Sequence, residues 1–180
     1  LELSREAYQL LLNPALSQGR FRLSCIMQTI GATGIRIGEL KYITVESLET
    51  GIVPVRSKGK ERVIFLTNSL TELLRAYCRR EGRTEGSVFI TRSGVPVDRK
   101  NVWADMKRLC RAAGVPESKV FPHNLRHLFA CWFYEKEKDL VRLADYLGHS
   151  NVETTRRYTM VSGSGIWQKQ LELGLLVSEE

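Results

Sequence analysis

Residues 147–158 read Leu-Gly-His-Ser-Asn-Val-Glu-Thr-Thr-Arg-Arg-Tyr, and the interpretation of the chain starts from this stretch. Gly148 is a residue type that ends helices in the left-handed conformation, and the Ser-Asn-Val-Glu after His149 forms a capping box that begins another helix. His149 is therefore expected in a tight corner between two helices. Tyr158 follows about two helical turns later, so the sequence predicts an imidazole and a phenol close together.

A second polar cluster lies upstream, where residues 122–127 read Pro-His-Asn-Leu-Arg-His. His123 and Arg126 share one face if this segment is helical. The apolar residues that follow form one broad stripe of the same helix, so Arg126 and His127 are expected on the opposite side. Imidazole, guanidinium and phenol together indicate chemistry on a phosphate. His123 and His127 also have a spacing that suits a metal, but Arg126 between them would repel a cation and no third ligand is evident.

The remaining pattern predicts an α+β fold, mostly helical with a small antiparallel sheet. Helical periodicity and capping residues predict helices over about 4–12, 20–30, 69–80, 98–114, 124–136 and 139–147. Two kinds of breaker are expected to act early in the chain: Asn13-Pro14 ends the first helix, and residues 31–34 interrupt the chain before a short helix over 35–40. Strands are predicted over 52–56 and 62–66 around a five-residue turn, with a smaller hairpin over 88–97.

Composition limits the classes of protein to which the chain can belong. With 180 residues and 43% hydrophobic side chains it is long enough for one globular domain, and its net charge of +7 favours an anionic partner, most often nucleic acid. Four widely spaced cysteines indicate small buried residues in a reducing compartment, neither a zinc site nor a disulfide framework. Without a membrane-length apolar run or a signal-peptide pattern, we expect a cytoplasmic protein.

Taken in order along the chain, five motifs resemble those of a known family, the tyrosine recombinases or phage integrases. They are Thr-Gly-Ile-Arg-Ile-Gly-Glu-Leu at 33–40, Lys58 in the predicted hairpin, His-Asn-Leu-Arg-His at 123–127, Leu-Gly-His at 147–149, and Tyr158. One motif alone would carry little weight, but the ordered set is specific and spans almost the whole chain. The sequence from residue 121 onward most resembles that of integrases of bacterial phages and conjugative transposons.

The resemblance implies a reaction at a DNA phosphodiester that uses no cofactor and no metal. Tyr158 matches the nucleophile that forms a covalent 3′-phosphotyrosyl bond. Arg36 and Arg126 match the two phosphate clamps, and Lys58 matches the general acid.

The same resemblance assigns the supporting residues of the site. His123 and His149 match the base and a phosphate ligand. Glu39 matches an acidic position that supports the first arginine, and because it lies three residues after Arg36 the two can pair on one helical face. His127 matches a histidine that is frequent in the family but not universal.

For the whole chain, residues 1–180, the resemblance implies a catalytic domain that carries out site-specific DNA recombination or integration. Double-stranded DNA is the expected partner, in a bacterial cytoplasm and on the nucleoid. An apolar tail helix over about 166–176 is expected to join protomers into a tetramer on DNA. The family's N-terminal core-binding domain matches nothing in this sequence, which also starts without a methionine, so a piece of a longer protein is expected.

Several alternatives stay open at the level of sequence. The same chemistry would serve a type IB topoisomerase or a telomere resolvase, and a DNA-binding module with an idle site would keep many of these residues. Arg36 and Glu39 could form only a surface ion pair. The basic hairpin around Lys58 could merely protect a sheet edge, and the tail could pack on its own domain.

Overall fold

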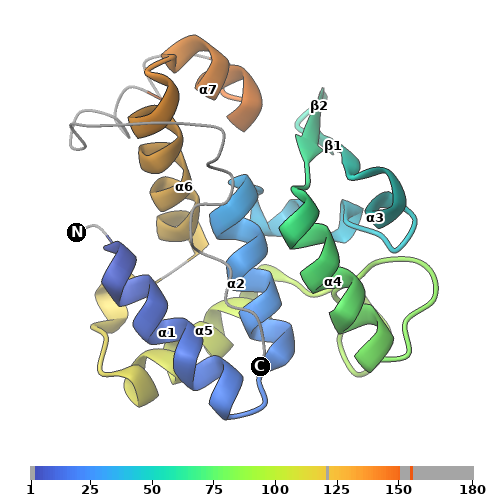
Figure 1. Ribbon diagram of the computed structural model, residues 1–180, viewed down its shortest axis with the longest axis vertical. Coiled ribbons are helices and arrows are strands. Elements are labelled where there is room, and N and C mark those ends of the chain that lie inside the picture. Colours follow the sequence, from blue (N-terminus) through green and yellow to red (C-terminus); the bar gives the residue numbers. More distant parts are fainter. Residues whose placement is uncertain (1–2, 121, 151–154, 156–180) are drawn as a thin grey trace.

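The structure is a computed structural model that describes residues 3–120, 122–150 and 155 (Figure 1). Helices form most of it, and the described part holds one two-stranded antiparallel sheet, which confirms the predicted fold class. In chain order the elements are α1 (Arg5–Ser17), α2 (Phe21–Thr33), the 3-10 helix η1 (Ile37–Tyr42), α3 (Ser47–Thr50), β1 (Ile52–Ser57), β2 (Lys60–Phe65), α4 (Asn68–Arg80), α5 (Arg99–Ala113), the 3-10 helix η2 (Glu117–Lys119), α6 (Pro122–Glu137) and α7 (Leu140–Leu147).

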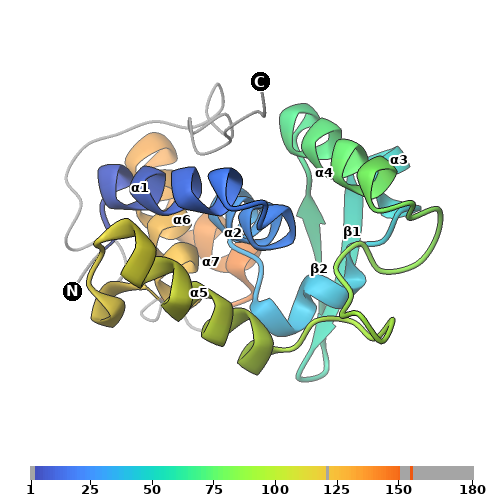
Figure 2. The same ribbon diagram turned by 90° about the horizontal axis from the view of Figure 1, so that it is seen from below.

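Helix α2 forms the centre of the molecule, and the two ribbon views show α1, α4, α5 and α6 around it (Figures 1 and 2). Every residue from 23 to 33 is buried, so α2 has no solvent-facing side. Its polar side chains bond within the helix: the Thr29 hydroxyl donates to Cys25 O and the Thr33 hydroxyl donates to Thr29 O. Satisfying these groups internally removes most of the penalty for burying them.

The sheet is a single hairpin whose register runs from Ile52 opposite Phe65 to Ser57 opposite Lys60. Two residues, Lys58 and Gly59, connect the strands, and their φ angles of 50° and 75° are those of a type I′ turn. The predicted five-residue turn was therefore wrong. Both strands extend to the tip because a primed turn matches their right-handed twist, whereas a longer loop would have left these pairs unmade.

Two predicted breaks in the helices were also wrong. Helix α1 continues through Pro14 to Ser17, because Leu11, Leu12 and Ala15 on its inner side are fully buried and this packing outweighs the hydrogen bond that proline removes. Helix α2 likewise continues past Gly31 and ends only at Gly34, whose φ is 63°.

Three local predictions needed smaller corrections. The second hairpin is reduced to an isolated bridge between Ile90 and Pro96. Helix α4 is capped by Thr67, whose hydroxyl accepts from the Leu70 N–H, and Ser69 lies inside the first turn. The short helix predicted over 35–40 is present as η1, shifted toward the C-terminus.

The prediction that the cysteines are buried is confirmed for all four. Across the described ranges, the structure contains no helix with both the length and the apolar character needed to cross a bilayer.

Gly34 gives a test of the packing between α2 and α6. A Cβ added there would lie 2.4 Å from Cδ1 of Phe129, a fully buried ring on α6. Gly34→Ala should lower the free energy of unfolding by about 1 to 2 kcal/mol for the left-handed backbone, and by about 1 to 3 kcal/mol more for the overlap. Urea denaturation followed by circular dichroism measures the loss.

Gly82→Ala is the matched control, because Gly82 has a φ of 64° and a Cβ there would meet no atom within 4 Å. It should show the backbone penalty alone. Equal losses in the two variants would contradict the close approach of Phe129.

Candidate active site

Arg126 lies at the meeting point of two helix ends. It lies in the first turns of α6 and is 5% exposed, so the side opposite the apolar stripe, where the sequence placed Arg126, is itself buried at this point. Its Nη1 donates to Gly34 O at the end of α2, and its Nη2 donates to Leu147 O at the end of α7 at 2.6 Å. Carbonyls at helix C-termini carry partial negative charge, which compensates a buried cation. The apolar stripe of α6 could not indicate this burial, because the carbonyls that accept from Arg126 come from segments distant in the sequence.

Arg36 and Glu39 form the ion pair that the sequence predicted, and the pair is not a surface one. The Glu39 side chain is 4% exposed, whereas that of Arg36 is 37% exposed. Arg36 donates twice to this carboxylate, from its backbone N–H at 2.9 Å and from Nη1 at 3.1 Å. The pair therefore fixes a half-exposed guanidinium on a buried anchor.

Arg62 was missed as a site residue in the sequence, although it contacts the same carboxylate. Its Nη1 and Nη2 donate to the two oxygens of Glu39 at 2.6 and 2.7 Å. Burial alone would raise the pKa of Glu39, but the hydrogen bonds from Arg62 and from the Arg36 backbone together hold that pKa below its ordinary value. Strand alternation could have revealed Arg62, since it points to the same side as the buried Ile64 and a charge on that side needs a partner.

His149 lies directly beyond Gly148, which ends α7 with a φ of 68°, as predicted. Its Nε2 is 3.3 Å from Arg126 Nη2 and its Nδ1 is 2.8 Å from the Thr155 hydroxyl. Burial first, and then the charges of Arg126, Arg36 and Arg62, lower the pKa of His149 to about 4. The ring is therefore neutral near pH 7. A guanidinium can only donate, so Nε2 accepts from Arg126 and Nδ1 carries the proton.

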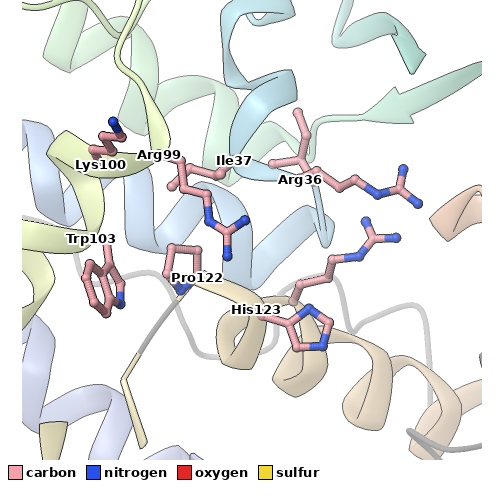
Figure 3. Close-up of a pocket in the computed structure, with 9 residues that line it drawn as sticks. Arg36, Ile37, Arg99, Lys100, Trp103, Pro122 and His123 are labelled. Atoms are coloured by element: carbon pink, nitrogen blue, oxygen red, sulfur yellow. The ribbon is translucent and has the colours of Figure 1, made fainter. Parts of the chain in front are cut away.

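Arg36, Arg126 and His123 line one open cavity of about 630 Å³. Figure 3 shows Arg36 and His123 at one end of it, Trp103 and Lys100 at the other, and Arg99 between them. Burial, followed by the nearby charges of Arg126, His127 and Arg99, lowers the pKa of His123. Its ring is thus available as a proton acceptor. The basic and aromatic wall contributed by α5 was not predicted, although the spacing of residues 99 and 103 places them on one helical face.

The remaining predicted site residues have two different outcomes. Among the described residues that line it, neither Lys58 nor His127 is found. Lys58 is exposed at the tip of the hairpin, and His127 is half-buried on α6. Tyr158, residues 151–153 of the predicted capping box and the predicted tail helix at 166–176 lie outside the described residues. The catalytic roles of all these residues stay predictions.

The three guanidinium groups of Arg36, Arg62 and Arg126, with the one carboxylate of Glu39, leave two net positive charges while His149 is neutral. In a partly desolvated cavity such an excess favours an anion with several acceptor oxygens. Across the described ranges, no group of three or more His, Cys, Asp or Glu side chains is placed to hold a metal ion. A phosphate is the ligand that this arrangement fits.

The low pKa of His149 predicts a pH dependence of stability. The folded-state pKa of about 4 lies below the 6.5 of a free imidazole, so the unfolded state binds more protons between these values. The stabilisation is complete above pH 6.5 and is lost as the pH falls toward 4. Imidazole NMR signals followed against pH measure the titration, and the signal absent from His149→Gln assigns the residue. A His149 signal that titrates between pH 6 and 7 would contradict the contacts described.

Comparison with known proteins places the fold in a family. The family model described as "Phage integrase family" matches residues 3–164. The tyrosine recombinase XerD of Staphylococcus saprophyticus is 33% identical over 171 residues, which are 89% of this chain and 58% of that protein. The chain thus spans less than two thirds of the length of this relative.

Solved structures agree. The XerA recombinase superposes with a TM-score of 0.77 at 28% identity, over 90% of this chain and 59% of that one. The XerH site-specific recombinase, solved with its difH substrate before cleavage, gives a TM-score of 0.73 at 25% identity, over 87% of this chain and 49% of that one. The family model matches residues 3–164, which are most of the sequence, and the fold agrees with that of these recombinases: this chain belongs to the phage integrase family.

Proposed function

We propose that this chain is the catalytic domain of a site-specific DNA recombinase that cuts and rejoins strands through a 3′-phosphotyrosyl bond on Tyr158. One observation carries the proposal. Arg36 and Arg126, far apart in sequence, line a single open cavity together with His123, in a cluster with excess positive charge. The XerD, XerA and XerH relatives, all recombinases by name, support the same activity.

The two arginines act on the phosphate. Attack on a phosphodiester concentrates negative charge on the non-bridging oxygens, and guanidinium groups already held in place stabilise that charge without reorganising. Glu39 holds Arg36, and the helix-end carbonyls hold Arg126. Loss of one such donor typically lowers the rate by about a hundredfold to a thousandfold.

Protons move in opposite directions at the two ends of the reaction. The Tyr158 hydroxyl loses its proton to His123 as its oxygen attacks phosphorus. The bond from phosphorus to the 5′ oxygen breaks, and that oxygen takes a proton from the Lys58 ammonium. The 3′-phosphotyrosyl bond conserves the energy of the broken linkage, so a 5′ hydroxyl of another strand can reverse the steps.

The other tyrosines fit this choice of nucleophile. Burial raises the pKa of the Tyr8 and Tyr146 phenols, and burial followed by the Glu81 charge raises that of Tyr77 to about 12. The Tyr42 hydroxyl donates to Arg56 O. These phenols serve packing and hydrogen bonding.

Double-stranded DNA is the proposed partner. The net charge of +7 and the exposed Arg99 and Lys100 at the rim of the cavity supply cations along a path that a DNA backbone can follow. The XerH site-specific recombinase, solved bound to its difH substrate, supports the assignment. Tetramer formation through the tail at 166–176 stays a prediction, because the tail lies outside the described residues.

A covalent-trapping experiment tests the proposal. The substrate is a pool of duplexes with randomised sequence around a nick, placed so that cleavage beside the nick releases a short strand and prevents rejoining. The unaltered chain should form a denaturant-resistant adduct, and peptide mapping should locate the DNA on Tyr158. Sequencing of the trapped DNA then reports the preferred site.

Tyr158→Phe should form no adduct, whereas Tyr134→Phe, a change at a half-buried tyrosine on α6, should keep it. No adduct with the unaltered chain would identify an idle DNA-binding module. Trapping without sequence preference, together with relaxation of supercoiled plasmid, would indicate a topoisomerase.

Lys58 has a separate test as the general acid. Lys58→Ala should slow cleavage by about a hundredfold or more. A substrate with sulfur in place of the bridging 5′ oxygen should restore the rate, since a thiolate leaves without a proton. Lys60→Ala, a change at a neighbouring exposed lysine of the hairpin, is the control and should have little effect. If sulfur fails to restore the rate, Lys58 acts by binding and not by protonation.

A further inference from the structure

Arg62 has no part in the mechanism above, yet it is among the most firmly held side chains near the cavity. It lies on β2, the strand that returns from the Lys58 turn, and its side chain is 11% exposed. All three of its side-chain nitrogens donate hydrogen bonds: Nη1 and Nη2 to the carboxylate of Glu39, and Nε to Tyr146 O at 3.0 Å. Arg62 thus connects a strand, a 3-10 helix and a helix end.

The first connection acts on Arg36 through Glu39. The carboxylate accepts two bonds from Arg62 and two from Arg36, and Arg62 makes the shorter pair. A bidentate guanidinium fixes the plane of a carboxylate as well as its position. With that plane fixed, the Arg36 side chain uses Nη1 on Glu39 and reaches the cavity at a defined angle. Without Arg62, the carboxylate could turn and pair with the Arg36 fork itself.

The second connection acts on His149 through the end of α7. Arg62 caps Tyr146 O, and Arg126 caps the next carbonyl, Leu147 O. Gly148 follows, and a Cβ there would lie 2.9 Å from Cδ of Arg62, so the turn packs directly on the Arg62 stem. His149 begins where this turn ends. Two guanidinium groups therefore hold two successive carbonyls in the last turn of α7.

We propose that Arg62 is a positioning residue for the phosphate chemistry, which sets Arg36 and His149 in register with the hairpin that carries Lys58. It acts through Glu39 and through the Tyr146 carbonyl. The inference rests on the proposed function, since it gives Arg62 a task in that reaction. The competing interpretation is an ion pair that contributes only to folding.

Two variants separate these interpretations. Arg62→Lys keeps the charge but cannot reach both oxygens of Glu39 and Tyr146 O together. Arg56→Lys is the matched control in the same hairpin, because the Arg56 side chain pairs with Glu61 at an exposed site. Its bond to η1, from the Tyr42 hydroxyl, is made by the backbone carbonyl, which the substitution keeps. Both are made in the full chain, and the fraction folded is measured first by thermal denaturation.

The main readout is the rate constant of single-turnover cleavage on the trapped substrate, compared with the dissociation constant for the same DNA. Arg62→Lys should lower the rate constant per folded molecule by about tenfold to a hundredfold, as expected when a clamp group moves by about 1 Å. The dissociation constant should change by less than about threefold, since contacts with the rest of the DNA remain. Arg56→Lys should match the unaltered chain in both.

A second readout does not depend on cleavage. Inorganic phosphate is titrated into each chain while the His149 ring signal is followed by NMR. Binding to the unaltered chain should shift that signal, and Arg62→Lys should need about tenfold more phosphate for the same shift. This readout keeps the two proposals apart, because phosphate binding can be measured even if no DNA adduct forms.

Three results decide the matter. Slower cleavage with weaker phosphate binding in Arg62→Lys, at equal folded fraction, supports the positioning role. Normal cleavage and normal phosphate binding per folded molecule, with only a lower melting temperature, overturns it while leaving the recombinase assignment intact. Failure of the unaltered chain to form an adduct overturns that assignment, and the phosphate titration then decides alone whether Arg62 sets the anion site.

Discussion

A buried positive charge at Arg126 is the constraint on which the arrangement of the helices depends. Moving a guanidinium out of water is unfavourable unless acceptors replace the solvent. The structure supplies them as backbone carbonyls at the C-terminal ends of α2 and α7, where partial negative charge accumulates. Both helices must therefore end beside the first turns of α6. Left-handed glycines at both ends allow this, because the chain can turn away at once: Gly34 makes room for Phe129 and Gly148 for the Arg62 stem.

Glu39 plays the complementary part for Arg36, the second proposed clamp. It is a buried carboxylate whose ionised form is maintained by two guanidinium groups, and the lowered pKa is the electrostatic result. Removing one partner of a buried pair usually destabilises more than the pair itself contributes, because the charge that remains is uncompensated. Glu39 and the helix-end carbonyls thus anchor the cations before any ligand is present. The low pKa of His149 has the same origin, since burial and three nearby guanidinium charges disfavour a further positive charge.

Sequence patterns predicted those features that depend on neighbours along the chain. The Arg36–Glu39 pair, the Gly148 helix end and most helices follow from spacings of three or four residues or from capping, and all are confirmed. The wrong turn length at Lys58 and Gly59 is a local error, since a two-residue primed turn lets the strands pair to the tip. Other wrong predictions involve distant contacts: Pro14 inside α1 is tolerated because of what packs beneath it. Arg126 is buried by the ends of two other helices, which the apolar pattern of α6 cannot indicate. The contact between Glu39 and Arg62 joins two segments that no short-range sequence pattern connects. The family motifs named Arg126 as a phosphate clamp, which stays a prediction, and they did not indicate how its side chain is held.

Arg36 and Arg126, the two proposed clamps, differ in a way that suits the proposed reaction, in which the charge distribution changes. Arg126 is almost wholly buried and bound to rigid helix ends, so its position is set by the fold. Arg36 is more exposed and bound to a side chain, so its position depends on what else Glu39 binds. A phosphate has oxygens on several sides, and a fixed donor opposite an adjustable one can follow them as the phosphorus changes geometry. Movement of the Arg36 guanidinium helps the reaction only if the range of its positions is narrow. The short bonds from Arg62 to Glu39 narrow it, because they leave the carboxylate one orientation from which to hold Arg36.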